Sequence, residues 1–214
     1  MQRQIKKSCI MKKKILLAVL LLLTCSAYAE EAKQLAKVDN YSGVYVFSYC
    51  EPVADYEVIG DVSVNGGGSS YYSIGGMSFY SSGELQYNEL RNGLIVSAVM
   101  ANRSVDGIII HPTKVNSGRA TMIKFKEGTE KKDRELAYVY KKRDYYIFVD
   151  CKPVSDYTYQ GKRRARLLMN GSTESLIGAI LTNTKNLSRD ANAIIVHFTT
   201  NGYDYAEAIT IKEE

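Results

Sequence analysis

The stretch Cys50-Glu51-Pro52-Val53-Ala54-Asp55-Tyr56 decides the fold, because the chain contains it twice. The second copy is Cys151-Lys152-Pro153-Val154-Ser155-Asp156-Tyr157, in which Cys, Pro, Val, Asp and Tyr keep their register. An apolar run precedes each copy, and a glycine, Gly60 or Gly161, follows it. Internal self-similarity of this kind is the signature of a duplicated module. The sequence therefore predicts two related halves with one cysteine of this motif in each.

The first 29 residues have the pattern of a secretory signal peptide. A positive region at Met11-Lys12-Lys13-Lys14 precedes the apolar run 15–23, and Ala27-Tyr28-Ala29 is a small-x-small cleavage signal. We expect cleavage of residues 1–29 just before Glu30, which makes the mature chain periplasmic or secreted. Leu22-Leu23-Thr24-Cys25 resembles a lipobox, so an outer-membrane lipoprotein is the alternative. The apolar run is too short to span a bilayer, so we expect no transmembrane segment in the mature chain.

Export also changes the charge of the protein. The full chain carries 28 Lys and Arg against 23 Asp and Glu. Six of the bases and none of the acids lie in residues 1–29, so subtracting them leaves 22 bases against 23 acids, a net charge of −1. This balance removes the general electrostatic argument for nucleic acid or an anionic membrane as the partner, and we expect no nucleic-acid binding.

The remaining chain divides into two modules. We expect the first over residues 34–127, a charged connector over 128–134 and the second module over 135–214. Hydrophobic patterns predict the following elements in the two modules: strands at 44–47, 56–64, 107–111 and 120–126 with a helix at 84–102, then strands at 145–149, 159–168, 193–197 and 206–212 with a helix at 173–187. Gly60 is a candidate β-bulge.

These patterns predict an α+β fold of two tandem β-β-α-β-β repeats packed as a pseudo-twofold unit. One helix cannot cover both faces of a four-stranded sheet, and about 80 residues is marginal for a separate core. We therefore expect the two modules to pack against each other.

Residues 65–83 interrupt the first module alone. This stretch, NGGGSSYYSIGGMSFYSSG, places Tyr71, Tyr72, Phe79 and Tyr80 among six Gly and six Ser. Interleaved Tyr, Ser and Gly is the composition of adaptable binding surfaces. The four aromatic residues are therefore a candidate binding loop, and the alternative is an insertion without a binding role.

The repeat also carries a family resemblance. The pattern Tyr-Val-Phe-x-x-Cys-x-Pro-Val-x-x-Tyr-x-x-x-Gly at residues 45–60 is followed by a helix and by Asp-Gly-Ile-Ile-Ile at 106–110. It resembles the small β-β-α-β-β modules of cell-envelope proteins, among them the YbjQ-like domain, which is labelled heavy-metal-binding, and the C-terminal domain of the Rcs stress-sensor lipoprotein. It resembles exported proteins of Bacteroides-type bacteria more closely still. The sensor relative implies disulfides and envelope partners, and the resemblance transfers no activity.

Cys50 and Cys151 are the two cysteines of the mature chain, and they occupy equivalent places. An oxidising compartment favours a disulfide between them, which requires Cα atoms within about 7 Å. Two buried thiols, one in each module core, fit the sequence equally well because Cys behaves as a small hydrophobe. Both interpretations stay open from the sequence.

His111 and His197 also occupy equivalent places, each at the end of a buried strand. With Cys50 and Cys151 they are candidate metal ligands. Two ligands per module are too few for a closed tetrahedral zinc site, and the chain has no CxxC or HxxxH spacing to support one. We therefore expect no metal and no cofactor, because duplication alone explains the symmetry.

The chain contains no catalytic motif of the GxSxG, HExxH, P-loop or dinucleotide-binding type. We therefore predict no catalytic residues and a function other than that of an enzyme. The expected function is that of an exported cell-envelope binding or interaction protein whose partner is an envelope protein or a glycan. The alternative is a metal- or thiol-dependent envelope protein that uses the duplicated Cys and His positions.

Overall fold

The computed structural model describes residues 33–65, 70–74, 77–81, 87–111, 117–164, 173–199 and 204–212. For residues 65, 70–74, 77–81, 173–174 and 187 it describes the backbone alone. The chain from Lys33 onward forms one unit. The expected signal peptide, residues 1–29, and its cleavage site lie outside the described residues.

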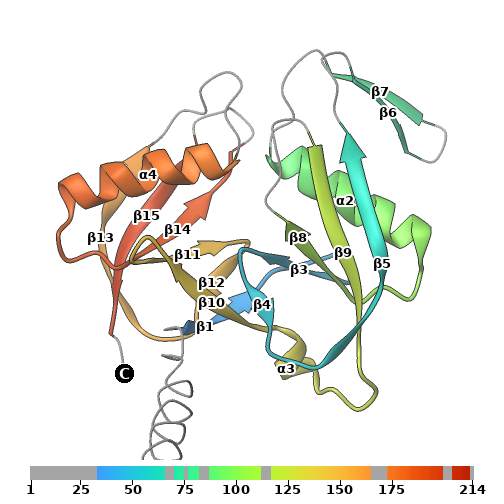
Figure 1. The fold of residues 1–214 in the computed structure, drawn as a ribbon, viewed down its shortest axis with the longest axis horizontal. Helices are drawn as coiled ribbons and strands as arrows, with labels where there is room; N and C mark the ends of the chain where they lie inside the picture. The colour runs from blue at the N-terminus through green and yellow to red at the C-terminus, as the bar shows by residue number, and fades with distance from the viewer. Residues whose placement is uncertain are drawn as a thin grey trace, which may run out of the picture. The chain divides into compact units, whose positions relative to one another are not determined.

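Strands of both halves alternate with two long helices and one short one (Figure 1). The first half contains β1 (Lys33–Val38), β2 (Asn40–Tyr41), β3 (Val44–Ser48), β4 (Glu51–Pro52), β5 (Tyr56–Asn65), β6 (Ser70–Ile74), β7 (Met77–Ser81), α2 (Tyr87–Ala101), β8 (Gly107–His111) and β9 (Ser117–Phe125). The second half contains α3 (Lys131–Arg134), β10 (Leu136–Lys142), β11 (Tyr145–Val149), β12 (Cys151–Pro153), β13 (Tyr157–Arg164), α4 (Thr173–Leu187), β14 (Ala193–His197) and β15 (Tyr205–Ile211).

The predicted α+β fold of two β-β-α-β-β repeats is wrong, because the described chain is mostly β. More than half of the described residues lie in strands, and fewer than a quarter lie in the three helices. Thirteen strands join one mixed sheet. The repeat pattern did not reveal β1, β4, β10 and β12, because these strands are stabilised by distant pairing partners more than by a pattern of their own.

The two halves exchange strands at the centre of this sheet. The order is β12-β1-β10-β11-β3-β8-β9-β5, and β14 continues from β11 through β15 to β13 (Figure 1). β1 lies antiparallel to β10 of the other half, and it also pairs with β12. β10 correspondingly pairs with β4. Backbone hydrogen bonds therefore join the halves in addition to side-chain packing.

β3 and β11 lie in the middle of the sheet, and every residue in both strands is buried. β3 runs parallel to β8, and β11 runs parallel to β14. Parallel neighbours require a crossover, which the segments containing α2 and α4 supply. Strands covered on both faces have continuous apolar sequences, which is why both strands could be predicted from the sequence.

Alternate residues of β3 face two different hydrophobic clusters. Val44 and Val46 pack in the cluster beneath α2, whereas Tyr45 and Phe47 belong to a central cluster on the opposite face. A third cluster lies beneath α4. The central cluster draws side chains from both halves, including the aromatic residues Tyr45, Phe47, Phe125, Tyr146 and Phe148.

The β-bulge predicted at Gly60 is confirmed. The register between β5 and β9 shifts between Val58 and Gly60, where Gly60 has a φ of 147°. An equivalent shift between Tyr159 and Gly161 occurs in β13, with a φ of 125° at Gly161. Both glycines occupy the left-handed region that other residues disfavour.

Several element bounds agree with the sequence predictions. α4, β8, β11 and β14 have the bounds expected from their hydrophobic patterns. Part of the predicted connector 128–134 forms α3. None of the helices in the described ranges has the length and apolar composition needed to cross a membrane.

Candidate functional site

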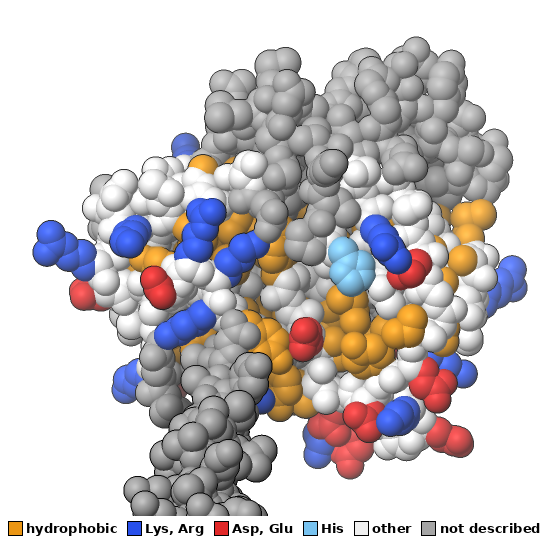
Figure 2. Space-filling model, viewed as in Figure 1, with side chains coloured by type: hydrophobic (Ala, Val, Ile, Leu, Met, Phe, Trp, Pro, Cys, Tyr) orange, Lys and Arg blue, Asp and Glu red, His pale blue; other side chains and the backbone are white. Residues whose placement is uncertain are grey.

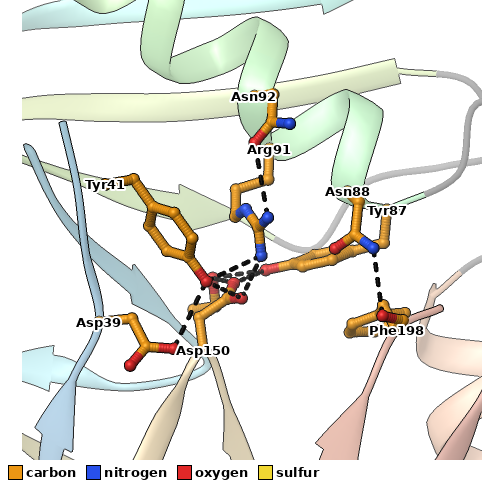
Figure 3. Close-up of polar contacts among 9 residues, drawn as sticks. Asp39, Tyr41, Tyr87, Asn88, Arg91, Asn92, Asp150 and Phe198 are labelled. Atoms are coloured by element: carbon orange, nitrogen blue, oxygen red, sulfur yellow. Dashed lines mark hydrogen bonds and ion pairs between the residues drawn. The ribbon is translucent and has the colours of Figure 1, made fainter. Parts of the chain in front are cut away.

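Among the described residues, the densest group of polar contacts surrounds Asp150, which lies between β11 and β12. Asp150 has a left-handed φ of 52°, and the equivalent residue of the first half, Tyr49, has a φ of 58°. Figure 3 shows the Asp150 carboxylate facing Tyr87 and Arg91, which lie near the start of α2. The site therefore joins a turn of the second half to a helix of the first.

Four side chains donate hydrogen bonds to this carboxylate. Arg91 Nη1 lies 2.7 Å from Oδ1 and forms an ion pair with it. The Tyr41 hydroxyl donates to the same oxygen at 3.4 Å, and Ser48 Oγ donates to Oδ2 at 3.0 Å. The Tyr87 hydroxyl also donates to Oδ2, and it lies 2.6 Å from Ser48 Oγ.

The surrounding aromatic rings extend the contact between the halves. The Arg91 guanidinium lies 4.1 Å from the centroid of the Tyr41 ring, and Nη1 donates to the Tyr41 hydroxyl oxygen at 3.0 Å. The Tyr87 ring stacks on Phe198 with centroids 4.0 Å apart, and Asn88 Nδ2 donates to the Phe198 carbonyl at 3.1 Å (Figure 3). The first turn of α2 is thus held against the segment that follows β14.

Burial controls the protonation of these groups. The side chains of Arg91 and Asp150 are 12% and 6% exposed. Burial raises the pKa of Tyr87 well above its ordinary value, and the Asp150 charge raises it further. The same two causes raise the pKa of Tyr41 and of the Asp39 carboxyl. The phenols therefore stay protonated and donate to Asp150.

A second such cluster, with the roles of the two halves exchanged, would need the same residue types at the corresponding positions, and the chain has other types there. Val149 occupies the position equivalent to Ser48, and Tyr49 occupies the position equivalent to Asp150. In the helices, Ile177 takes the place of Arg91 and lies in the hydrophobic cluster beneath α4. The sequence therefore supports this cluster where α2 meets the turn at Asp150, and not where α4 would meet the turn at Tyr49.

The cluster has the chemistry of a structural ion pair. Ser48 is fully buried, and its hydroxyl already contacts Tyr87 and Asp150. A buried ion pair with several hydrogen bonds fixes one arrangement of the elements that carry it. The motif search did not find this site because Arg91 and Asp150 are 59 residues apart. A comparison of the two copies carries the signal, since Ser48, Asp150 and Arg91 stand where the other copy has Val149, Tyr49 and Ile177.

The structure brings Cys50 and Cys151 together. Both are free thiols, 5% and 3% exposed, and both belong to the central cluster. Interaction with the Cys50 thiol, together with burial, raises the pKa of Cys151. The predicted pair is therefore adjacent across the junction of the halves.

The structure places His111 and His197 in two separate polar groups. His111 Nε2 lies 2.8 Å from Thr121 Oγ1, which in turn donates to Asp61 at 2.8 Å. The His197 ring stacks on Tyr205 with centroids 4.6 Å apart. Among the described residues, no group of three or more His, Cys, Asp or Glu side chains could hold a metal ion.

The four candidate binding residues lie in a separate hairpin. β6 and β7 form a two-stranded antiparallel sheet apart from the thirteen-stranded one. Tyr71 is the register partner of Tyr80, and Tyr72 is the register partner of Phe79. The aromatic positions therefore form two adjacent cross-strand pairs.

The outer strands β5 and β13 expose apolar side chains at equivalent positions. Tyr56 and Val58 are 36% and 62% exposed, and Tyr157 and Tyr159 are 43% and 57% exposed. Figure 2 shows Lys and Arg side chains spread over the left of this view, and Asp and Glu side chains gathered with Lys or Arg at the lower right. The charge on this face is therefore mixed in sign.

No protein-family model, curated protein or solved structure matches this chain. The resemblance to YbjQ-like and Rcs-sensor modules therefore stays a prediction from the repeat pattern.

Proposed function

We propose that this chain is an exported cell-envelope binding protein without catalytic activity, and that the β6–β7 hairpin is its binding element. The observation that carries the proposal is the separation of this hairpin from the thirteen-stranded sheet. The main sheet is complete without the hairpin, because β5 pairs with β9 along its length. The hairpin is therefore available for a role other than holding the fold together.

The composition of the hairpin supports a protein as the partner. Its four aromatic residues occupy two neighbouring cross-strand pairs, and cross-strand pairs are the units that order a two-stranded sheet. Tyr combines a large apolar ring with a hydroxyl and loses little conformational entropy on binding. Ser and Gly around it supply small, adaptable hydrogen-bonding groups, as in binding loops that recognise protein surfaces.

The buried contacts support a binding protein over a reactive centre. The most connected polar cluster encloses a buried serine and an ion pair. Among the described residues, the thiol pair and the histidines belong to different groups. No observation thus favours the metal-dependent alternative.

Site-specific photo-crosslinking tests the proposal. The probe p-benzoyl-phenylalanine replaces Tyr72 in the hairpin or, as the matched control, exposed Tyr159 in β13. After irradiation of cells that export the protein, we expect a discrete protein adduct from position 72 and none from position 159. Equal adducts at both positions, or none at position 72, would contradict a binding role for the hairpin.

Removal of residues 66–82 separates binding from folding. We expect this variant to unfold cooperatively at a temperature close to that of the parent chain, because the main sheet keeps its pairing. Loss of cooperative unfolding would show that the hairpin is structural. Co-sedimentation of the parent chain, but not of this variant, with purified peptidoglycan and without a protein adduct would contradict a protein partner and identify a glycan instead.

A further inference from the structure

We propose that Cys50 and Cys151 form a disulfide that links the two halves of the exported protein. The proposal concerns the covalent structure of the core and does not depend on the binding role of the hairpin. The geometry that supports it comes from the strands on either side of the two cysteines.

Equivalent residues of the two halves face one another near this point. Ala36 of β1 pairs with Ala137 of β10, and Ser48 of β3 pairs with Val149 of β11. In both pairs the partners are the same position of the two copies. Cys50 and Cys151 each lie two residues beyond Ser48 and Val149, after the left-handed residues Tyr49 and Asp150.

The intervening residues turn both chains in the same way. Tyr49 and Asp150 each have a left-handed φ, after which β4 and β12 pair with strands of the opposite half. In this exchange Cys151 is the register partner of Val38 in β1. Both thiols lie in the central cluster, and interaction with Cys50, together with burial, raises the pKa of Cys151.

Two independent buried thiols would not need to lie in one shared cluster. A cysteine that serves only as a small hydrophobe fits the core of its own half. Here both side chains occupy the cluster shared by the halves. Their place in one shared cluster supports the disulfide among the two interpretations that the sequence left open.

The reaction is a two-step thiol–disulfide exchange with a small-molecule or protein disulfide as the oxidant. One cysteine thiolate attacks a sulfur of the oxidant, which forms a mixed disulfide and releases one oxidant thiol. The second cysteine thiolate then displaces the other oxidant sulfur. The Cys50–Cys151 bond forms, the oxidant's S–S bond breaks, and the two protons and two electrons lost by the cysteines appear in two oxidant thiols.

Burial determines when this exchange happens. The attacking species is the thiolate, and thiols that are 5% and 3% exposed meet no bulky oxidant. We therefore expect the bond to form during folding, before the central cluster closes. Once formed, the same burial protects it from reductants.

The decisive measurement is made on protein purified from the cell envelope without reductant, with its thiols blocked by N-ethylmaleimide. Non-reducing proteolysis and mass spectrometry should recover the Cys50 and Cys151 peptides as one cross-linked species, about 2 Da lighter than the sum of the two. Recovery of both cysteines as blocked thiols would overturn the proposal. Recovery of either cysteine linked to a second chain would overturn it as well.

A stability comparison provides an independent test. The same chain refolded with a glutathione redox couple should unfold about 5–15 °C higher than the chain refolded in excess reductant, because the bond closes a loop of about 100 residues. The C50A/C151A variant is the control, and it should unfold at one temperature under both conditions. An equal redox-dependent shift in the parent and in this variant would contradict the proposed bond.

Discussion

Ala36 of β1 lies directly opposite Ala137 of β10, which is its own counterpart in the second copy. Both side chains are fully buried in the central cluster. The same cluster holds the larger side chains of Phe47 and Phe148. At the junction of the halves, Ala36 thus pairs with the residue that occupies the same position in the other copy.

Enlarging either alanine should destabilise the protein. We expect A36L and A137L each to lower the free energy of unfolding by about 1–3 kcal/mol, because a well-packed core accommodates added volume poorly. Urea denaturation measures the change. The control A101L alters an exposed position at the end of α2 and should change the value by less than about 0.5 kcal/mol.

Breaking the Arg91–Asp150 ion pair should cost more. D150A leaves a guanidinium that is 12% exposed without its carboxylate, and R91M leaves a carboxylate that is 6% exposed without its cation. We expect each single change to lower the free energy of unfolding by about 3–5 kcal/mol. The double variant should lose about 1–3 kcal/mol less than the sum of the single losses, since neither charge remains. Strict additivity in the double-mutant cycle would contradict the coupling.

Tyr87 should make the protein sensitive to alkali. The unfolded chain releases the phenol proton near the ordinary pKa of 10.0, whereas burial keeps Tyr87 protonated in the folded state. Above about pH 10 the unfolded state therefore binds fewer protons, and the free energy of unfolding falls as pH rises, by up to about 1.4 kcal/mol per pH unit for one such group.

Urea unfolding between pH 9 and pH 11.5 tests this sign. The Y87F variant is less stable at neutral pH because it loses its hydrogen bonds, yet its stability should fall less steeply above pH 10. The control Y159F changes an exposed tyrosine and should keep the slope of the parent. An unchanged slope in Y87F would mean that Tyr87 ionises alike in both states.

Alanine substitutions can be compared at the two bulge glycines, Gly60 and Gly161. A Cβ at Gly60 would lie 2.8 Å from Met122 Cε in the core, whereas a Cβ at Gly161 would lie 2.9 Å from Arg163 Nη1, the end of a partly exposed side chain. Both positions have a left-handed φ that penalises alanine. We expect G60A to lower the free energy of unfolding by about 2 kcal/mol and G161A by about 1 kcal/mol. Equal losses in chemical denaturation would show that backbone strain alone decides the effect.

The repeat and the hydrophobic patterns predicted the positions of the central strands and of α4, because strands covered on both faces and amphipathic helices have sequence periods of their own. They also predicted the bulge at Gly60. The cluster around Asp150 could not be predicted in this way. Its members come from four separate segments, and the contacts to Asp150 arise only when the two halves meet.

By itself, the sequence determined that the Cys-Pro motif occurs twice, where several long elements lie and which residues correspond between the two copies of the motif. These features depend on local composition and period, which a chain carries before it folds. Only the tertiary structure decided that β1 and β10 exchange partners, that thirteen strands form one sheet, and that Cys50 and Cys151 share one buried cluster. Backbone hydrogen bonding places no demand on side-chain identity, so the partner of a short strand is selected by the packing of the whole molecule.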